Sequence, residues 1–202
     1  FLLHHFHNKE LRLVFRKFRL NPGTIKTIYA VGIPSIIMSA LVSVLTFGMN
    51  IILKAYEPAA ATVFGVYFKL QSFVYMPVFG MNNGIVPIIA YNYGAGKPKR
   101  ITDTLKLGVI CSVAIMIVGL LLFQLIPVQL LGMFAPTDDM IRLGETALRI
   151  FSVSFVFAGV SIVLSSGFQA LGNGFYSMIV FIVRLIVPTL PFAWLFGIIG
   201  GV

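Results

Sequence analysis

The chain has 202 residues, of which 58% are hydrophobic and only 10% are charged, and its mean hydropathy is +0.98. Soluble domains are about half apolar and about a quarter charged, so this composition argues against a water-soluble globule and favours a bilayer. The formal net charge of +9 would suggest a nucleic-acid partner in a soluble protein. Here the basic residues lie mainly between long apolar runs, so we expect a cytoplasmic membrane face and no nucleic-acid partner.

The predicted elements are helices. Residues 1–6 suggest the tail of a membrane span, and residues 10–20 suggest a basic amphipathic helix on an anionic leaflet. A bilayer-crossing helix needs roughly 20 mostly apolar residues, and five later segments meet that requirement. These predicted spans are 28–53, 62–91, 105–131, 147–171 and 176–199. The loops between them are short, so the sequence predicts an all-α integral membrane fold with antiparallel neighbouring helices.

The basic loops predict the orientation of these helices. Residues 9–26 contain six Lys and Arg, and residues 97–106 contain four, whereas the alternate loops contain few. The positive-inside rule therefore places loops 9–26 and 97–106 in the cytoplasm of a multi-pass cell-membrane protein, with the 172–174 turn on the same side. The chain starts without Met and ends in apolar sequence, from which we expect a fragment of a longer protein.

Polar residues inside the spans mark candidate functional positions, because polar groups in a bilayer usually face a protein interior or water. In the first span a polar stripe repeats at helical spacing: Ser35, Ser39, Ser43, Thr46 and Asn50. The three serines predict a seam between helices, since small hydroxyl residues permit close packing. Asn50 is a candidate for a cavity wall.

The second span has the most polar residues. One predicted face holds Lys69, Ser72, Met76 and Asn83; beside it lie Gln71, Tyr75 and Asn82. Lys69 either faces a cavity or extends towards the outer membrane surface. Pro77 and Pro87 predict a bent helix. With Phe79, these residues suit a cavity wall that changes shape.

The fifth span contains Arg184, which we expect to face the interior as a structural or gating group. No Asp or Glu lies in the middle of any predicted span, so this part of the protein shows no ion-coupling site and no metal site. An integral membrane enzyme is a weaker alternative, because only His4, His5 and His7 cluster at one interface. The 94–97 run lacks the spacing of a phosphate loop and predicts a helix C-cap followed by a basic loop.

Several segments resemble the MATE (multidrug and toxic compound extrusion) family of transporters. Residues 66–73, 76–81 and 87–97, the last reading PIIAYNYGAGK, are similar to the eighth helix and the following loop of that family. Residues 32–34 resemble the start of the seventh helix, and residues 168–174 resemble the join between the tenth and eleventh. The resemblance implies a twelve-helix protein with two pseudo-symmetric lobes. Residues 1–26 would then be the end of helix six and a cytoplasmic linker, and residues 27–202 the C-terminal lobe, truncated before its last helix.

The same resemblance implies a function. Family members export organic cations in exchange for Na⁺ or H⁺ by rocking between inward-open and outward-open states. In one subgroup, acidic residues of helices seven and ten bind the ion; this chain has none there, which favours an ion site in the missing N-terminal lobe. No cofactor is expected; the implied partners are lipid, that lobe and organic cations. Candidate cavity residues are Asn50, Lys69, Gln71, Tyr75, Met76, Phe79, Asn82, Asn83 and Arg184. The positive Lys69 and Arg184 keep an alternative open, a related flippase for lipid-linked precursors.

Overall fold

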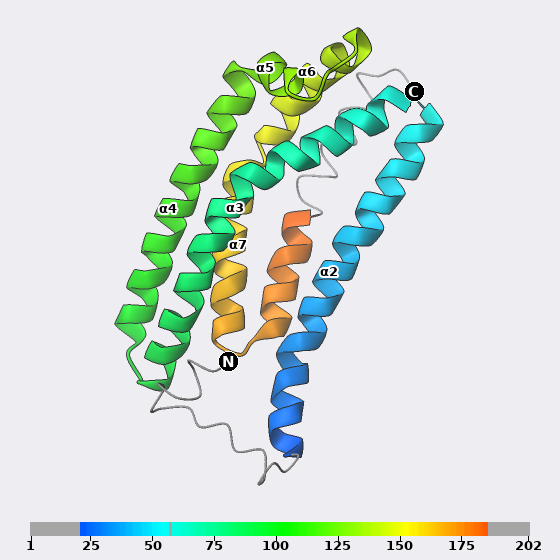
Figure 1. Ribbon diagram of the computed structural model, residues 1–202. Helices are drawn as coiled ribbons and strands as arrows, with labels where there is room; N and C mark the ends of the chain where they lie inside the picture. The colour runs from blue at the N-terminus through cyan, green and yellow to red at the C-terminus, as the bar shows by residue number, and fades with distance from the viewer. Residues whose placement is uncertain (1–20, 57, 186–202) are drawn as a thin grey trace, which may run out of the picture.

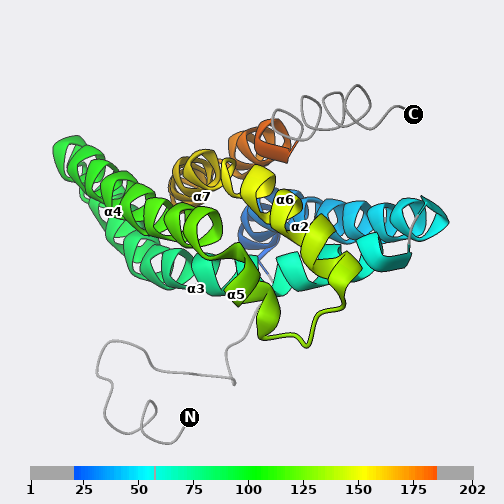
Figure 2. The same ribbon diagram turned by 90° about the horizontal axis from the view of Figure 1, so that it is seen from above.

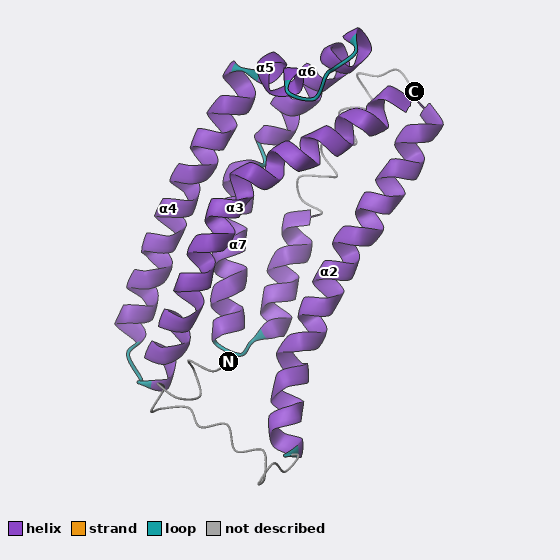
Figure 3. Ribbon diagram, in the orientation of Figure 1, coloured by secondary structure: helices purple, strands orange, loops and turns teal. Residues whose placement is uncertain are grey.

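The computed structural model describes residues 21–56 and 58–185, and its regular structure there is entirely helical (Figure 3). The labelled helices are α2 (Pro22–Tyr56), α3 (Pro58–Gly94), α4 (Pro98–Leu125), α5 (Pro127–Gly132), α6 (Asp138–Ser152) and α7 (Phe155–Ala170). A last helix, Gly174–Leu185, follows α7. The predicted segments 1–6 and 10–20 lie outside the described residues. The predicted all-α membrane fold is confirmed.

Three of the described helices are long and apolar enough to cross a membrane: Pro22–Ile51, Ala59–Gly94 and Pro98–Leu125. A fourth span results if α6 and α7, which meet at an angle of 47°, are counted together. The predicted fifth span, 176–199, begins in the last helix and continues beyond the described residues. The predicted spans therefore correspond to observed helices wherever the structure describes them.

Two predicted spans were wrong in part, one in where it ends and one in being a single helix. The third span was expected to continue to residue 131, but α4 ends at Leu125. Ile126 leaves the helical conformation (φ −129°, ψ 42°) because it precedes Pro127, whose ring disfavours a helical residue before it. The fourth span was expected as one helix over 147–171, but it is broken between Ser152 and Phe155.

The first half of that broken pair, α6, is amphipathic rather than uniformly apolar. Thr137 caps its N-terminus by accepting a hydrogen bond from the Met140 N–H, and Asp138 and Asp139 lie in its first turn, where carboxylates favour the helix dipole. Charged residues continue along its exposed side, including the Arg149–Glu145 ion pair at 2.9 Å. The helix α6 thus begins at Asp138, before residue 147, where the fourth span was expected to start.

The helices run up and down between two ends (Figure 1). The start of α2 and the turns that follow α3 and α7 lie at one end; α5, α6 and the end of α2 lie at the other. Both turns are closed by a glycine with positive φ, Gly96 at +64° and Gly172 at +80°. At the α3 end, Lys97 N–H bonds Asn92 C=O at 2.9 Å, which completes a Schellman cap and confirms the predicted C-cap.

The core lies where α3, α4 and α7 pack together. Figure 2 shows α4 alongside α3, with α7 next to them. Close approach depends on glycines: a Cβ at Gly119 would collide with Val74, and a Cβ at Gly159 would lie 2.9 Å from Met116 Cγ. Ser112, fully buried in α4, also bonds the Gly159 carbonyl at 3.2 Å. Small residues at such seams are typical of membrane helix packing.

Candidate functional site

The polar stripe on α2 is satisfied by its own helix. Each of its five side chains donates to the carbonyl four residues earlier, at 2.8 to 3.3 Å: Ser35, Ser39, Ser43, Thr46 and Asn50. No described helix packs over Ser39 or Ser43, which are exposed, so the predicted serine seam is not formed within the described part of the chain. Since each hydroxyl of the stripe donates to a carbonyl, this face can border lipid, water or ligand without an unpaired hydroxyl donor.

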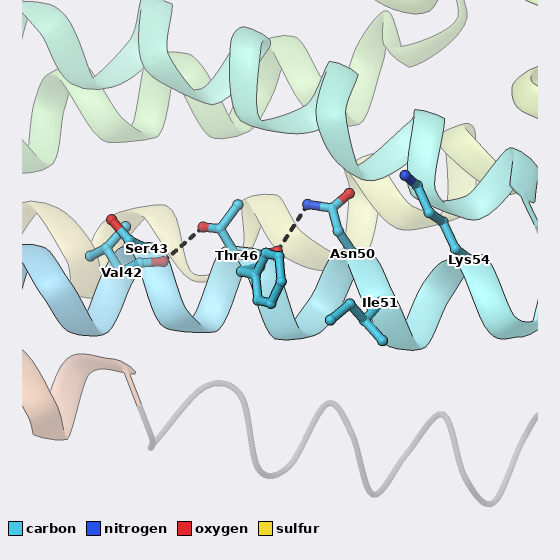
Figure 4. A pocket seen from close by; sticks show the side chains of 7 residues that line it. Val42, Ser43, Thr46, Asn50, Ile51 and Lys54 are labelled. Atoms are coloured by element: carbon cyan, nitrogen blue, oxygen red, sulfur yellow. Dashed lines mark hydrogen bonds between the residues drawn. The ribbon is translucent and has the colours of Figure 1, made fainter.

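A hollow of about 590 Å³ lies along the second half of this stripe. It is lined by one helix, through Val42, Ser43, Thr46, Phe47, Asn50, Ile51 and Lys54. Figure 4 shows Ser43, Thr46, Asn50 and Lys54 projecting from the same side of α2. Asn50 donates to Thr46 C=O at 2.9 Å, which leaves its amide oxygen as an acceptor at the surface of the hollow.

Polar and aromatic side chains of α3 form what we call the polar–aromatic cluster: Tyr67, Gln71 and Tyr75. Tyr67, Gln71 and Tyr75 are spaced by four residues and therefore share one side of α3. Gln71 Nε2 donates to the Tyr67 hydroxyl at 2.9 Å. On the helix Gly174–Leu185, Arg184 lies with its guanidinium carbon 5.0 Å from the Phe181 ring centroid. Two of the expected residues, Gln71 and Tyr75, thus share one side of α3 with Tyr67.

Aromatic rings from both sides of the α6–α7 break hold this cluster. The ring of Tyr67 lies 4.9 Å from that of Phe151, the penultimate residue of α6. The ring of Tyr75 lies 5.6 Å from that of Phe155, the first residue of α7. Phe123 of α4 closes the group at 5.0 Å from Phe155. Sequence reasoning missed Tyr67, although its spacing from Gln71 and Tyr75 was a usable signal.

The exposed face of α3 carries three other expected residues. Met76 is 67% exposed and Phe79 is 50% exposed, and Asn83 is exposed one to two turns further along. A large apolar side chain on an open face is one that a ligand or another part of a protein can cover. These residues share a face with each other, and they are separate from the core.

Lys69 lies nearer the start of α3, and Asn82 lies on the buried side of the helix. Lys69 is exposed, and its ammonium lies 5.8 Å from the centroid of the Phe134 ring, near the end of the bundle that carries α5 and α6. Asn82 is only 5% exposed, on the buried side of α3 with Val78 and Ile85. Neither polar atom of its amide has a hydrogen-bond partner among the described residues. The structure therefore separates Asn82 from its neighbour Asn83.

Within the described residues, no three His, Cys, Asp or Glu side chains come close enough to hold a metal ion. The described carboxylates lie near helix ends or on α6: Asp103, Asp138, Asp139 and Glu145. The inner polar groups are amides, phenols, hydroxyls and cations, which bind and orient molecules. Long apolar helices that carry such polar groups define a multi-pass helical membrane protein.

Comparison with known proteins gives the family. Residues 34–195, most of the chain, match the MatE family. The chain therefore belongs to the MatE family of multidrug and toxic compound extrusion transporters, which is not a family of enzymes. This confirms the resemblance drawn from the residues of the second span.

Curated relatives are multidrug export proteins named MepA. The chain is 28% identical over 183 residues to MepA of Staphylococcus aureus strain MSSA476, covering 89% of this chain and 40% of that protein. It is 26% identical to MepA of Staphylococcus haemolyticus over 99% of this chain and 45% of that protein. The chain thus spans less than half the length of these relatives.

Solved structures share the fold. An outward-facing multidrug resistance MATE transporter of the MOP superfamily superposes with a TM-score of 0.84 at 21% identity. A MOP superfamily transporter from Pyrococcus furiosus, described as having a binding pocket of reversed polarity, also gives 0.84, at 22% identity. Each superposition covers 96% of this chain and 44% of the other. The described helices therefore correspond to about half of a MATE transporter.

Proposed function

We propose that the full-length protein is a secondary antiporter that exports organic, mostly cationic and amphiphilic compounds from the cell in exchange for Na⁺ or H⁺. The match of residues 34–195 to the MatE family carries this proposal, together with relatives that are multidrug export proteins. This chain supplies one lobe, and the remainder of the protein supplies the other. The membrane concerned is the cell membrane.

In this proposal the open faces of α2 and α3 form one wall of the substrate cavity. The hollow beside Asn50 offers hydrogen-bond acceptors, and Met76 and Phe79 offer adaptable and aromatic contact. Aromatic faces attract organic cations, and methionine adapts to ligands of different shapes. Asn83 and Tyr75 add polar groups that fix the orientation of a ligand.

Alternating access uses the irregular helices. α3 contains Pro77 and Pro87, and Figure 1 shows that it bends near its middle. Each proline removes one backbone hydrogen bond, so less free energy is needed to change the bend than in a regular helix. The α6–α7 break provides a second joint. Movement at these joints opens the wall towards one side of the membrane and closes it towards the other.

The coupling ion binds in the remainder of the protein under this proposal, because a proton or Na⁺ site in a membrane normally uses a carboxylate. The carboxylates described here lie near helix ends or on α6, and none of them lines the α2 hollow. The lobe then responds to ion binding through contacts with its partner lobe, and it requires no cofactor.

The test is efflux of a fluorescent lipophilic cation from cells that express the full-length protein. We expect efflux to fail when the Na⁺ gradient or the proton gradient is collapsed, and the gradient required identifies the ion. Asn83→Ala should slow efflux at equal expression, whereas Thr102→Ala, at an exposed position in the first turns of α4, should not. Well-inserted protein that gives no gradient-dependent efflux would contradict the proposal.

A lipid-precursor flippase is the second candidate, favoured by one observation. Arg184 is a partly buried cation on the helix Gly174–Leu185, and a positive charge there suits a phosphate-bearing substrate. Lys54 at the hollow adds a second cation. Loss of lipid-linked precursor translocation in cells that lack the protein, with unchanged dye efflux, would favour this candidate over drug export.

A further inference from the structure

The break between α6 and α7 consists of Val153 and Ser154, so neither proline nor glycine interrupts the helix there. In a continuous α-helix the Val153 N–H would bond to the Arg149 carbonyl, four residues earlier. It bonds instead to the Ile150 carbonyl at 3.3 Å, which tightens the last turn of α6. The Ser154 N–H likewise bonds to the Phe151 carbonyl, three residues earlier, at 3.1 Å. The break therefore leaves the Arg149 carbonyl without its helical donor.

A side chain from another helix takes over that carbonyl. Gln124, the penultimate residue of α4, donates from Nε2 to the Arg149 carbonyl at 2.8 Å. The fully buried Ser152 hydroxyl donates to the same carbonyl at 2.9 Å and accepts from the same Gln124 nitrogen at 3.1 Å. A carbonyl oxygen has two lone pairs, and these two donors occupy both. The Val153 N–H is excluded from the Arg149 carbonyl because that acceptor is already saturated.

The angle of the break determines how α6 and α7 contact the polar–aromatic cluster. The ring of Phe151, before the break, lies 4.9 Å from that of Tyr67. The ring of Phe155, after the break, lies 5.6 Å from that of Tyr75. The two phenylalanines belong to helices that meet at 47°. A change of that angle therefore moves at least one of these rings relative to α3.

We propose that Gln124 is the positioning residue of this joint: its amide maintains the angle between α6 and α7 by occupying the Arg149 carbonyl. When the bond from Gln124 breaks, the Val153 N–H returns to that carbonyl and the two helices straighten. One acceptor thus alternates between two donors. The control of the angle follows from these hydrogen bonds alone, whereas its use in alternating access rests on the proposed export function.

The angle is measured as a distance across the break in the full-length protein. Spin labels are attached at Arg142→Cys and Leu164→Cys, exposed positions of α6 and α7, after replacement of Cys111 and any other native cysteines. Pulsed electron paramagnetic resonance gives the distance. Gln124→Met removes both N–H donors and keeps an unbranched side chain of similar length. Gln129→Met, the same substitution at an exposed position of α5, is the matched control.

Straightening the 47° bend should lengthen the mean distance by about 3 Å, since each helical residue adds about 1.5 Å along the axis. We expect this change in Gln124→Met and none in Gln129→Met. Ser152→Ala frees one lone pair of the carbonyl and should give a smaller change in the same direction, which tests the proposal even if Gln124→Met does not fold.

A lower melting temperature of Gln124→Met with the wild-type distance would overturn the proposal, because the amide would then stabilise the fold without setting the angle. An unchanged distance with an unchanged melting temperature would overturn it as well.

Efflux of the fluorescent cation from cells separates the joint from the export function. Gln124→Met should slow efflux about five-fold at equal expression, as expected for loss of one neutral hydrogen bond, and Gln129→Met should not slow it. A lengthened distance with unchanged efflux would overturn the use of this joint in transport. If the wild type gives no efflux while Gln124→Met still lengthens the distance, the export function fails and the role of Gln124 in setting the angle stands.

Discussion

Asn82 and Asn83 are neighbours in α3, yet their surroundings are opposite. Asn83 lies on the exposed face with Met76 and Phe79, as the helical spacing predicted. Asn82 is buried beside Val78 and Ile85, and its amide has no partner among the described residues. A buried amide without hydrogen bonds costs about 1–3 kcal/mol. The unpaired Asn82 amide therefore lowers the stability of the described part of the chain.

We expect Asn82→Leu to keep or raise the apparent melting temperature of the full-length protein, because it replaces an unpaired amide by an apolar side chain of the same branched shape. The measurement is a thermal melt in detergent, with Asn83→Leu as the control that leaves the temperature unchanged. A fall of several degrees for Asn82→Leu would mean that the amide has a partner in the assembled protein.

Helical spacing predicted which side chains share a face of α3. The pattern correctly grouped Lys69, Ser72, Met76 and Asn83 on one face, and all four are exposed. It could not tell which of the remaining faces turns towards the core, because in this apolar helix every face carries hydrophobic residues. Tyr67 and the rings around it were therefore found only from the packing of α3 on α4, α6 and α7.

The elements show where composition is a poor guide. The long helices could be predicted from the length of their apolar segments, since α2, α3 and α4 are each long enough to cross a bilayer. The helix ends at Gly94 and Ala170 could also be predicted, because Gly96 and Gly172 follow them and a glycine at positive φ closes a helix. The break between α6 and α7 has no proline or glycine within it. It could therefore be found only in the structure, where Phe151 and Phe155 pack on either side of it.

The glycine seams give a prediction at this scale. Gly119→Ala should lower the apparent melting temperature, because its Cβ would collide with Val74 and overpacking costs about 1–3 kcal/mol. Gly132→Ala, at the exposed end of α5, has nothing within 4 Å and should be neutral. Thermal melts of the two full-length variants make the comparison. Equal melting temperatures would show that the α3–α4 contact is looser than described.

The two ends of the described helical bundle differ in charge. Lys97, Lys99, Arg100 and Lys106 gather where α3 turns into α4, and Asp138 and Asp139 lie at the other end, in α6. The alternation of basic loops predicted this arrangement, and the structure confirms that the turns after α3 and α7 lie at one end. What covers the open α2 and α3 faces could not be predicted from this chain, and under the proposed function it is the remainder of the protein.

The orientation is tested by labelling single cysteines in a full-length background in which Cys111 and any other native cysteines are replaced. Lys99→Cys should react with a membrane-impermeant maleimide only after permeabilisation, because the positive-inside rule places that turn in the cytoplasm. Asp138→Cys should react in intact cells. Reaction in the reverse order would invert the proposed orientation.

The central claim is that this lobe belongs to an exporter driven by an ion gradient. The most direct measurement is counter-transport by the purified full-length protein in proteoliposomes, with a lipophilic dye on one side and an imposed Na⁺ or proton gradient. We expect the dye to move against its own concentration gradient as long as the Na⁺ or the proton gradient is present, and not to do so when both ion gradients are absent. Dye movement that is equal with and without any gradient, or no movement by correctly inserted protein, would contradict it.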